Sequence, residues 1–151
     1  MKVKVDYRLG GKPRYYAADE GDCQTMQVPD EIRKSVAFVC YEDDTNIKLA
    51  GTAFFVAIKR GDLYFEYAVT AKHVIVGVEL NSKNDKVFLR VNTRSGATEN
   101  IETRVNQWRY SDDSSVDVAV IHLELPKGID YLTIPVDMAA TDEVITREAL
   151  G

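Results

Sequence analysis

The chain has 151 residues, which is enough for one domain with a substantial core and too few for two domains of ordinary size. Its composition, 45% hydrophobic and 28% charged, is that of a globular protein and excludes a disordered chain. The net charge of −5, with no cluster of Lys and Arg, disfavours nucleic acid as a partner, because an acidic surface repels phosphates. No run of residues reaches the length of a membrane span, and the N-terminal segment lacks the apolar core of a signal peptide, so we expect a cytoplasmic protein with no membrane partner.

Residues 1–27 are predicted to form an N-terminal extension made of a β-hairpin and a loop. Apolar and charged residues alternate over residues 2–9, which predicts a half-buried strand. The Gly-Gly-Lys-Pro sequence at residues 10–13 turns the chain, and residues 14–17 return beside the first strand. Residues 18–27 are polar and are expected to form the loop.

Residues 28–138 are predicted to form a single six-stranded antiparallel β-barrel. Residues 28–34 form a short helical turn, with Pro29 and two acidic residues at its start. Short apolar or alternating runs then follow, separated by polar turns at near-regular intervals, as is typical of a small all-β barrel. The six predicted strands span residues 35–41, 49–58, 63–70, 87–92, 98–108 and 117–123.

One segment of this domain has helical spacing instead. Ala71, Val74, Ile75 and Val78 recur at positions i, i+3, i+4 and i+7, which predicts a short helical turn after the third strand. Thr70 is the expected cap of this turn, and His73 lies in its first residues.

The two cysteines, Cys23 and Cys40, can form a disulfide if their neighbourhoods meet. Their wide separation and the expected cytoplasmic location favour two reduced, buried thiols. Only His73 and His122 are available to complete a Cys/His metal centre, so we expect no metal site and no cofactor.

Three segments together carry a resemblance to a known family: Gly-Thr-Ala-Phe-Phe-Val at 51–56, Ala-Val-Thr-Ala-Lys-His-Val at 68–74, and Val-Asp-Val-Ala-Val-Ile-His-Leu at 116–123. In type, order and spacing they resemble the first half of a trypsin-like (chymotrypsin-fold) serine peptidase, closest to the bacterial cytosolic and HtrA-like branches. The resemblance covers roughly residues 28–151. It implies that the predicted barrel is one half of the double barrel of that family.

The resemblance assigns His73 as the general base and Asp117 as the carboxylate that orients it. In such a pair the imidazole takes the proton of a serine hydroxyl, and the carboxylate holds the imidazole in the correct tautomer. Val74 stands where secreted members of the family have a disulfide cysteine, which agrees with a cytoplasmic location. Taken singly, His73 is also compatible with an ordinary helix-turn histidine, and Asp117 with an acid that caps the preceding Ser-Asp-Asp-Ser-Ser loop. His122 is separated from Val118 and Val120 by an even number of residues, so its side chain is expected on the same face of the strand as theirs. It is interpreted as a residue of the sheet face.

The nucleophile expected by the same resemblance is missing from the chain. No Ser or Cys follows Asp117, and none of the later threonines, Thr133, Thr141 and Thr146, lies in a glycine-rich loop. Residues 139–151 resemble the start of an interdomain linker, with the second barrel expected to be absent. The chain as given is therefore predicted to be inactive.

Three interpretations remain open. In the preferred one, the chain is the N-terminal portion of a trypsin-like serine endopeptidase. In the second, it is a natural pseudo-protease that uses the barrel for binding. In the third, it is a small β-barrel protein-binding module in which His73 and Asp117 do not act together. The expected partners are a peptide or protein substrate, by the resemblance, and either the second barrel or a second copy bound at the exposed barrel face.

Overall fold

The computed structural model of the protein describes residues 3–6, 14–17, 29–44 and 46–138. The predicted loop at 18–27, the predicted linker at 139–151 and Cys23 lie outside the described residues. At the N-terminus, β1 (Val3–Asp6) pairs antiparallel with β2 (Arg14–Ala17), so the predicted hairpin is present.

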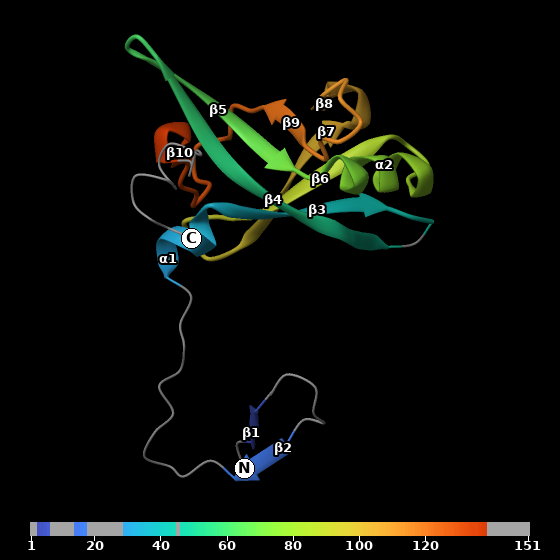
Figure 1. Ribbon diagram of the computed structural model, residues 1–151, viewed down its shortest axis with the longest axis vertical. Coiled ribbons are helices and arrows are strands. Elements are labelled where there is room, and N and C mark those ends of the chain that lie inside the picture. The colour runs from blue at the N-terminus through green and yellow to red at the C-terminus, as the bar shows by residue number, and fades with distance from the viewer. Residues whose placement is uncertain (1–2, 7–13, 18–28, 45, 139–151) are drawn as a thin grey trace.

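The main structural element is one sheet of eight strands, in which all neighbours are antiparallel except β10, which runs parallel to β4 (Figure 1). The strand order is β7-β6-β3-β4-β5-β9-β8, and β10 lies beside β4 off this path. The strands are β3 (Val36–Glu42), β4 (Ile47–Arg60), β5 (Leu63–Thr70), β6 (Lys86–Asn92), β7 (Thr98–Arg104), β8 (Arg109–Tyr110), β9 (Ala119–His122) and β10 (Ile134–Pro135). The prediction of a mainly antiparallel β domain is thus confirmed.

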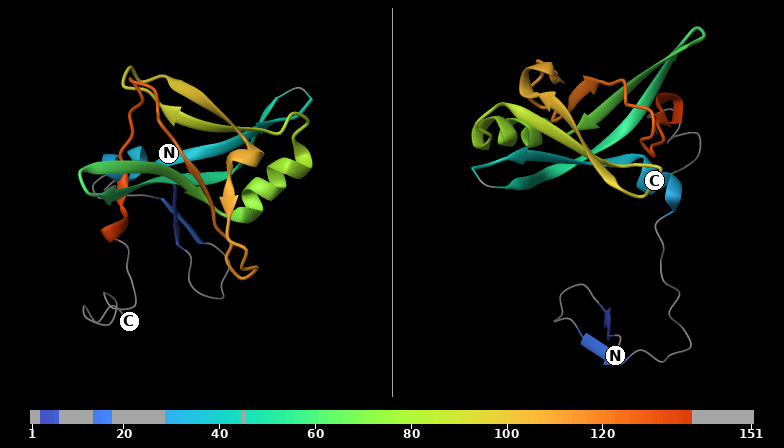
Figure 2. Two further views of the ribbon diagram at one scale, coloured as in Figure 1. Left: turned by 90° about the horizontal axis from the view of Figure 1, so that it is seen from above. Right: turned by 180° about the vertical axis from the view of Figure 1, so that it is seen from behind.

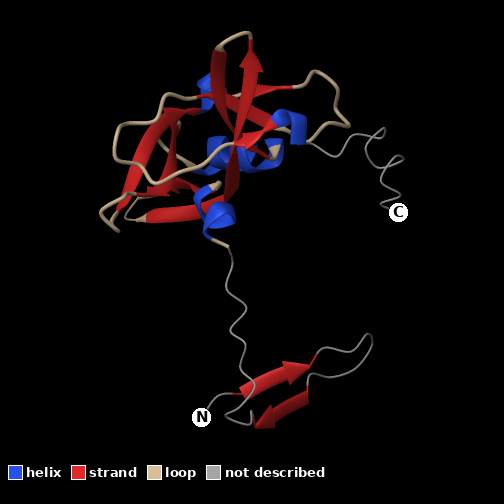
Figure 3. Cartoon of the chain, turned by 90° about the vertical axis from the view of Figure 1, so that its left-hand side faces the viewer, coloured by secondary structure: helices blue, strands red, loops and turns tan. Residues whose placement is uncertain are grey.

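Few helices accompany the strands (Figure 3). They are α1 (Asp30–Lys34), α2 (Lys72–Asn81), and the 3₁₀ helices η1 (Val105–Gln107) and η2 (Val136–Met138). The short turn predicted around His73 is therefore a ten-residue helix, α2. No helix within these described ranges is long and apolar enough to cross a membrane.

The sheet is curled but open, which corrects the prediction of a six-stranded closed barrel (Figure 2). No pairing between described residues joins its two end strands, β7 and β8. The reason lies in residues 98–108, which were predicted as one strand. At Arg104 the backbone N–H donates to Oε1 of Gln107 (2.8 Å), and the chain turns into η1 instead of continuing β7. It then enters β8 at the opposite edge of the sheet, beside β9.

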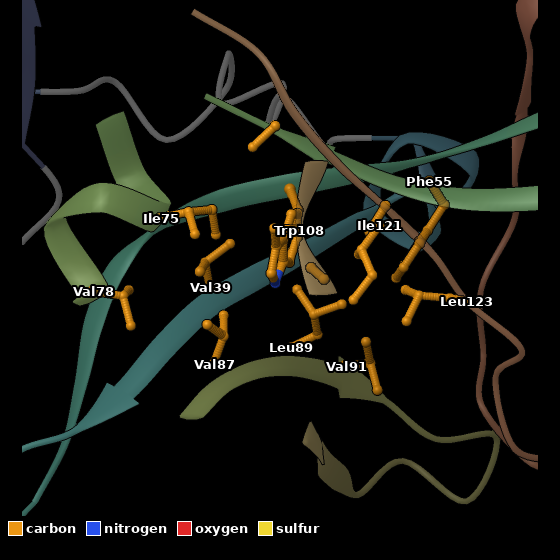
Figure 4. Packing of buried hydrophobic residues seen from close by; sticks show 14 of the residues in the cluster. Val39, Phe55, Ile75, Val78, Val87, Leu89, Val91, Trp108, Ile121 and Leu123 are labelled. Carbon is orange, nitrogen blue, oxygen red and sulfur yellow. The ribbon is translucent and has the colours of Figure 1, made fainter. Parts of the chain in front are cut away.

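Alternate residues of the strands and one face of α2 form the core (Figure 4). Ile75 and Val78 of α2 are completely buried and lie against Val39 and Val87 of the sheet. Trp108, just after η1, fills the centre, and its indole N–H donates to the Thr103 hydroxyl (3.2 Å). The buried cluster comprises Ala37, Val39, Ala53, Phe55, Ala68, Ile75, Val78, Val87, Leu89, Val91, Val105, Trp108, Ala119, Ile121, Leu123 and Ile129.

The segment after β9 is tied to the sheet through Tyr131. Its hydroxyl donates to Oε2 of Glu66 in β5 (2.7 Å), and its ring meets the Phe55 ring edge-on, with centroids 5.6 Å apart. Burial and the bond to Glu66 raise the pKa of Tyr131 to about 12. Cys40 is a buried free thiol, and burial raises its pKa.

Candidate active site

His73 and Asp117 are in direct contact. Nδ1 of the His73 ring lies 2.5 Å from Oδ2 of Asp117, and the backbone N–H of His73 donates to Oδ1 of the same carboxylate (2.9 Å). The two residues predicted from separate segments of the sequence are therefore brought together by the fold, 44 residues apart in the chain.

The pairing of two strands explains this meeting. β5 and β9 are antiparallel, with Thr70 at the end of β5 opposite Ala119 at the start of β9. The chain that leaves β5 and the chain that enters β9 are consequently side by side at one end of the sheet. His73 follows Thr70 by three residues and Asp117 precedes Ala119 by two, so each side chain extends from the same end.

Asp117 also accepts a hydrogen bond from the N-terminus of α2, a role that was predicted for Thr70. The N-cap residue of α2 is Ala71, which has no side chain able to cap, and the Thr70 hydroxyl donates instead to the Thr52 carbonyl (2.7 Å). The first amides of a helix lack intrahelical acceptors, and the helix dipole favours negative charge there. Asp117, from a distant part of the sequence, supplies both the hydrogen-bond acceptor and the negative charge at this helix end. The prediction that Thr70 caps the helix is therefore wrong.

These bonds favour an ionised Asp117 and one tautomer of a neutral His73 ring. The hydrogen bond from the His73 backbone N–H, followed by that from its ring, holds the pKa of the Asp117 carboxyl below its usual value. An ionised carboxylate can only accept hydrogen bonds, so the proton of a neutral His73 ring lies on Nδ1. The Nε2 lone pair is then free to accept a proton, which is the state that a general base requires.

The pair lies at the surface. The His73 side chain is 72% exposed and that of Asp117 is 54% exposed, and no described side chain bonds to Nε2. In a working triad the orienting carboxylate is buried. The His73–Asp117 pair, here called the dyad, is therefore formed in this chain with both side chains exposed to solvent.

The other candidate residues are placed elsewhere. His122 lies on the sheet face, as expected, with its ring 5.5 Å from that of Tyr67. The Ser-Asp-Asp-Ser-Ser loop is capped by Asp113, whose Oδ1 accepts both the backbone N–H and the hydroxyl of Ser115 (2.8 and 2.7 Å). The carboxylate of Asp117 is therefore not used for that loop. In the part of the chain that the structure describes, no group of three or more His, Cys, Asp or Glu side chains is placed to hold a metal ion.

Gly51, for which no role was predicted from the sequence, lies against the segment that carries His73. A Cβ atom built there would lie 2.9 Å from Cγ2 of Val74, the residue that follows His73. A lone glycine inside a strand pattern is a signal for such a close approach, and Gly51 sits inside the long strand β4.

Comparison of the chain with protein-family profiles, with curated proteins and with solved structures finds no match.

Proposed function

We propose that this chain supplies the general base, His73, and the orienting acid, Asp117, of a trypsin-like serine endopeptidase, with the nucleophile provided from outside the chain. The observation that supports the proposal is the double hydrogen bond between the two residues, to the ring and to the backbone N–H of His73. A histidine held in the Nδ1–H tautomer by an ionised carboxylate, with Nε2 unpartnered among the described residues, has the arrangement that activates a serine hydroxyl.

In this proposal the reaction follows the acyl-transfer sequence. Nε2 of His73 accepts the proton of a serine hydroxyl as the serine oxygen bonds to the carbonyl carbon of a peptide. Asp117 stabilises the imidazolium that forms, and His73 then passes the proton to the amine nitrogen as the C–N bond breaks. A water molecule repeats the sequence on the acyl-enzyme, which releases the carboxylic acid and restores the serine.

The trypsin-like fold, which three segments of the sequence resemble, has a place for the nucleophile in its second β domain. We propose that the curled sheet corresponds to the first of the two β domains of the trypsin-like fold, and that a second domain covers the exposed dyad. The exposure of His73 and Asp117 supports this, because a covering surface is needed to exclude water and to bring both a serine and an oxyanion hole to the imidazole. The substrate class is a peptide or protein.

A test compares the two histidines of the chain in the full gene product. Wild type is expected to hydrolyse peptide substrates and to be labelled by a fluorophosphonate probe. His73→Ala is expected to lower kcat by a factor of about 10⁴ to 10⁶, as loss of the base does in serine peptidases. His122→Ala, which removes the exposed histidine on the sheet face, is the matched control and leaves activity within a few-fold. Equal effects of the two substitutions, or a wild type with neither hydrolysis nor labelling, would exclude the proposal.

A second candidate function is protein binding without catalysis. Its support is a group of exposed apolar side chains on the outer face of β3 and β4: Val36, Phe38 and Phe54, with Val36 and Phe54 directly opposite each other. Phe38 and Phe54 occupy diagonal positions on the same face and are 51% and 43% exposed, and exposed apolar side chains gathered on one face mark an interaction site. We propose that in the isolated chain this face, called here the β3–β4 outer face, binds a second copy of the chain.

A further inference from the structure

Two contacts from one short stretch of β4 hold the segment that carries His73. The Thr70 hydroxyl donates to the carbonyl of Thr52 (2.7 Å), and Thr70 is only 5% exposed. The residue before Thr52 in β4 is Gly51, which lies against the side chain of Val74. The two contacts fall on either side of His73, three residues before it and one residue after it.

The contact of Thr70 lies where the backbone ladder ends. The last paired residues of β4 and β5 are Phe54 and Val69, so Thr70 has no register partner in β4. Its hydroxyl replaces the missing ladder bond with a side-chain bond to β4, at the point where the chain leaves the sheet for α2. On its other side Thr70 pairs with Ala119, two residues after Asp117. Thr70 therefore joins β4 to the ends of both strands from which the dyad extends.

The contact of Gly51 depends on the absence of a side chain. A Cβ at this position would lie 2.9 and 3.0 Å from the two γ-carbons of Val74. Real Cβ atoms essentially never approach this closely, so one of the two groups must move. A valine side chain on a helix has one strongly preferred χ1 rotamer, so rotation does not relieve the overlap, and β4 and the first turn of α2 have to move apart.

We propose that Thr70 and Gly51 are positioning residues for the dyad: by fixing the first turn of α2 against β4, they set the His73 ring within hydrogen-bond distance of Asp117. The bond from Nδ1 to Oδ2 joins a ring carried by this turn to a carboxylate carried by the chain that enters β9, so a displacement of the turn relative to β9 changes the length and angle of the bond. The relevance of the two residues to peptide hydrolysis rests on the proposed function, whereas their effect on the hydrogen bond does not.

The test reads the tautomer of His73 directly. In isotope-labelled protein at about pH 8.5, where an ordinary histidine is neutral, two-bond ¹H–¹⁵N spectra show which ring nitrogen carries the proton. An exposed histidine with no partner favours the Nε2–H form, and the bond to Asp117 reverses this preference. His122, in the same spectrum, provides an internal reference.

Thr70→Val is expected to return most of the His73 signal to the Nε2–H form, whereas Thr70→Ser, which keeps the hydroxyl, preserves the Nδ1–H form. Thr103→Val is the matched control. Thr103 is 4% exposed, and its hydroxyl donates to the Val87 carbonyl (3.0 Å) between β7 and β6. The same hydroxyl also accepts the indole N–H of Trp108 (3.2 Å), so its loss disturbs the core at least as much as the loss of the Thr70 hydroxyl, and it is expected to leave the His73 tautomer unchanged. An unchanged tautomer in folded Thr70→Val, or an equal change in Thr103→Val, would overturn the role of Thr70.

Gly51→Ala gives an independent result if Thr70→Val does not fold. We expect Gly51→Ala to shift the tautomer, and the double substitution Gly51→Ala with Val74→Ala, which removes the clashing γ-carbons, to restore it. Gly77→Ala, in α2 with nothing within 4 Å of the added carbon, is the control and has no effect. A Gly51→Ala protein with the wild-type tautomer would exclude the role of Gly51. None of these outcomes depends on peptidase activity, so a failure of the proposed function would be recognised separately.

Discussion

Asp117 binds His73 with both of its carboxylate oxygens: Oδ1 accepts the backbone N–H and Oδ2 accepts the ring Nδ1. The same side chain therefore holds the first turn of α2 and the imidazole that this turn carries. Because two bonds from one planar group restrict both the backbone and the ring, the direction of Nε2 is set without a contact to Nε2 itself.

Asp117→Asn is expected to abolish this arrangement while the domain stays folded. An amide can present its NH₂ group to Nδ1, which favours the wrong tautomer, and loss of the carboxylate in a triad lowers kcat by about 10⁴. Steady-state hydrolysis by the full gene product measures the effect. Asp113→Asn is the control, since Asp113 also accepts two hydrogen bonds, but within its own loop. A kcat that falls equally in both variants would contradict the assigned role.

The pH dependence of stability follows from Asp117 and Asp113, whose pKa values are both lowered by hydrogen bonds. For Asp117 the main cause is the His73 backbone N–H, and for Asp113 it is the Ser115 hydroxyl. A carboxyl with a lower pKa in the folded state stabilises the fold above its unfolded pKa of about 3.9, and this stabilisation is lost as the pH falls through the folded pKa. Urea unfolding between about pH 5 and pH 2 is expected to show a decline that is shallower in Asp117→Asn. An identical decline in that variant would contradict the prediction.

At high pH the relevant group is Tyr131. Burial, followed by the hydrogen bond to Glu66, raises its pKa to about 12, so the neutral phenol is favoured in the folded protein. The resulting stabilisation is complete below the unfolded pKa of about 10 and is lost as the pH rises toward the folded value. Glu66→Gln removes the negative charge and should lower the pKa of Tyr131, which phenolate absorbance measures with Tyr131→Phe as the reference. A Tyr131 pKa that does not change in Glu66→Gln would show that the bond is not formed.

A comparison of two leucines tests the core. Leu89 on β6 is completely buried, and Leu89→Ala is expected to lower the free energy of unfolding by about 2–5 kcal/mol through lost burial and a residual cavity. Leu80 on α2 is 79% exposed, and Leu80→Ala should change the free energy of unfolding by less than about 0.5 kcal/mol. Denaturant unfolding of both variants gives the comparison. Similar values would mean that Leu89 does not belong to the core.

The β3–β4 outer face predicts self-association of the isolated chain. Wild type is expected to sediment as a concentration-dependent mixture of monomer and dimer, and the double substitution Phe38→Ser with Phe54→Ser to sediment as monomer. Tyr64→Ser, which removes an aromatic residue that is 64% exposed near the β4–β5 turn, is the control. A wild type that stays monomeric at high concentration would exclude this interface.

Local patterns predicted the elements of the fold well where each element depends on its own residues. The apolar runs that became β3, β4 and β5, and the helical spacing of Ile75 and Val78, all report burial on one face. The two-residue strands β8 and β10 have no comparable signal, because their pairing is decided by distant partners in β9 and β4. The open edge of the sheet was missed for a different reason: the turn after Arg104 depends on a local bond from its backbone N–H to the Gln107 side chain, which interrupts a run of residues that otherwise has strand character.

The dyad residues were predicted from the resemblance of three segments, and the structure shows their contact. The supporting interactions were not predicted. Thr70 has the residue type and position of a helix cap, but a carbonyl in β4 is the acceptor that its hydroxyl reaches. The actual partner of the helix N-terminus, Asp117, is remote in sequence, and no local rule can connect it to α2.

The most direct measurement of the central claim, that His73 and Asp117 act as a base and its orienting acid, is the ring-nitrogen spectrum of the unmodified chain beside that of Asp117→Asn. We predict that His73 carries its proton on Nδ1 in the wild type and mainly on Nε2 in the variant, while His122 is the same in both. A wild-type His73 with its proton on Nε2, or a tautomer that does not respond to the loss of the Asp117 carboxylate, would contradict the claim.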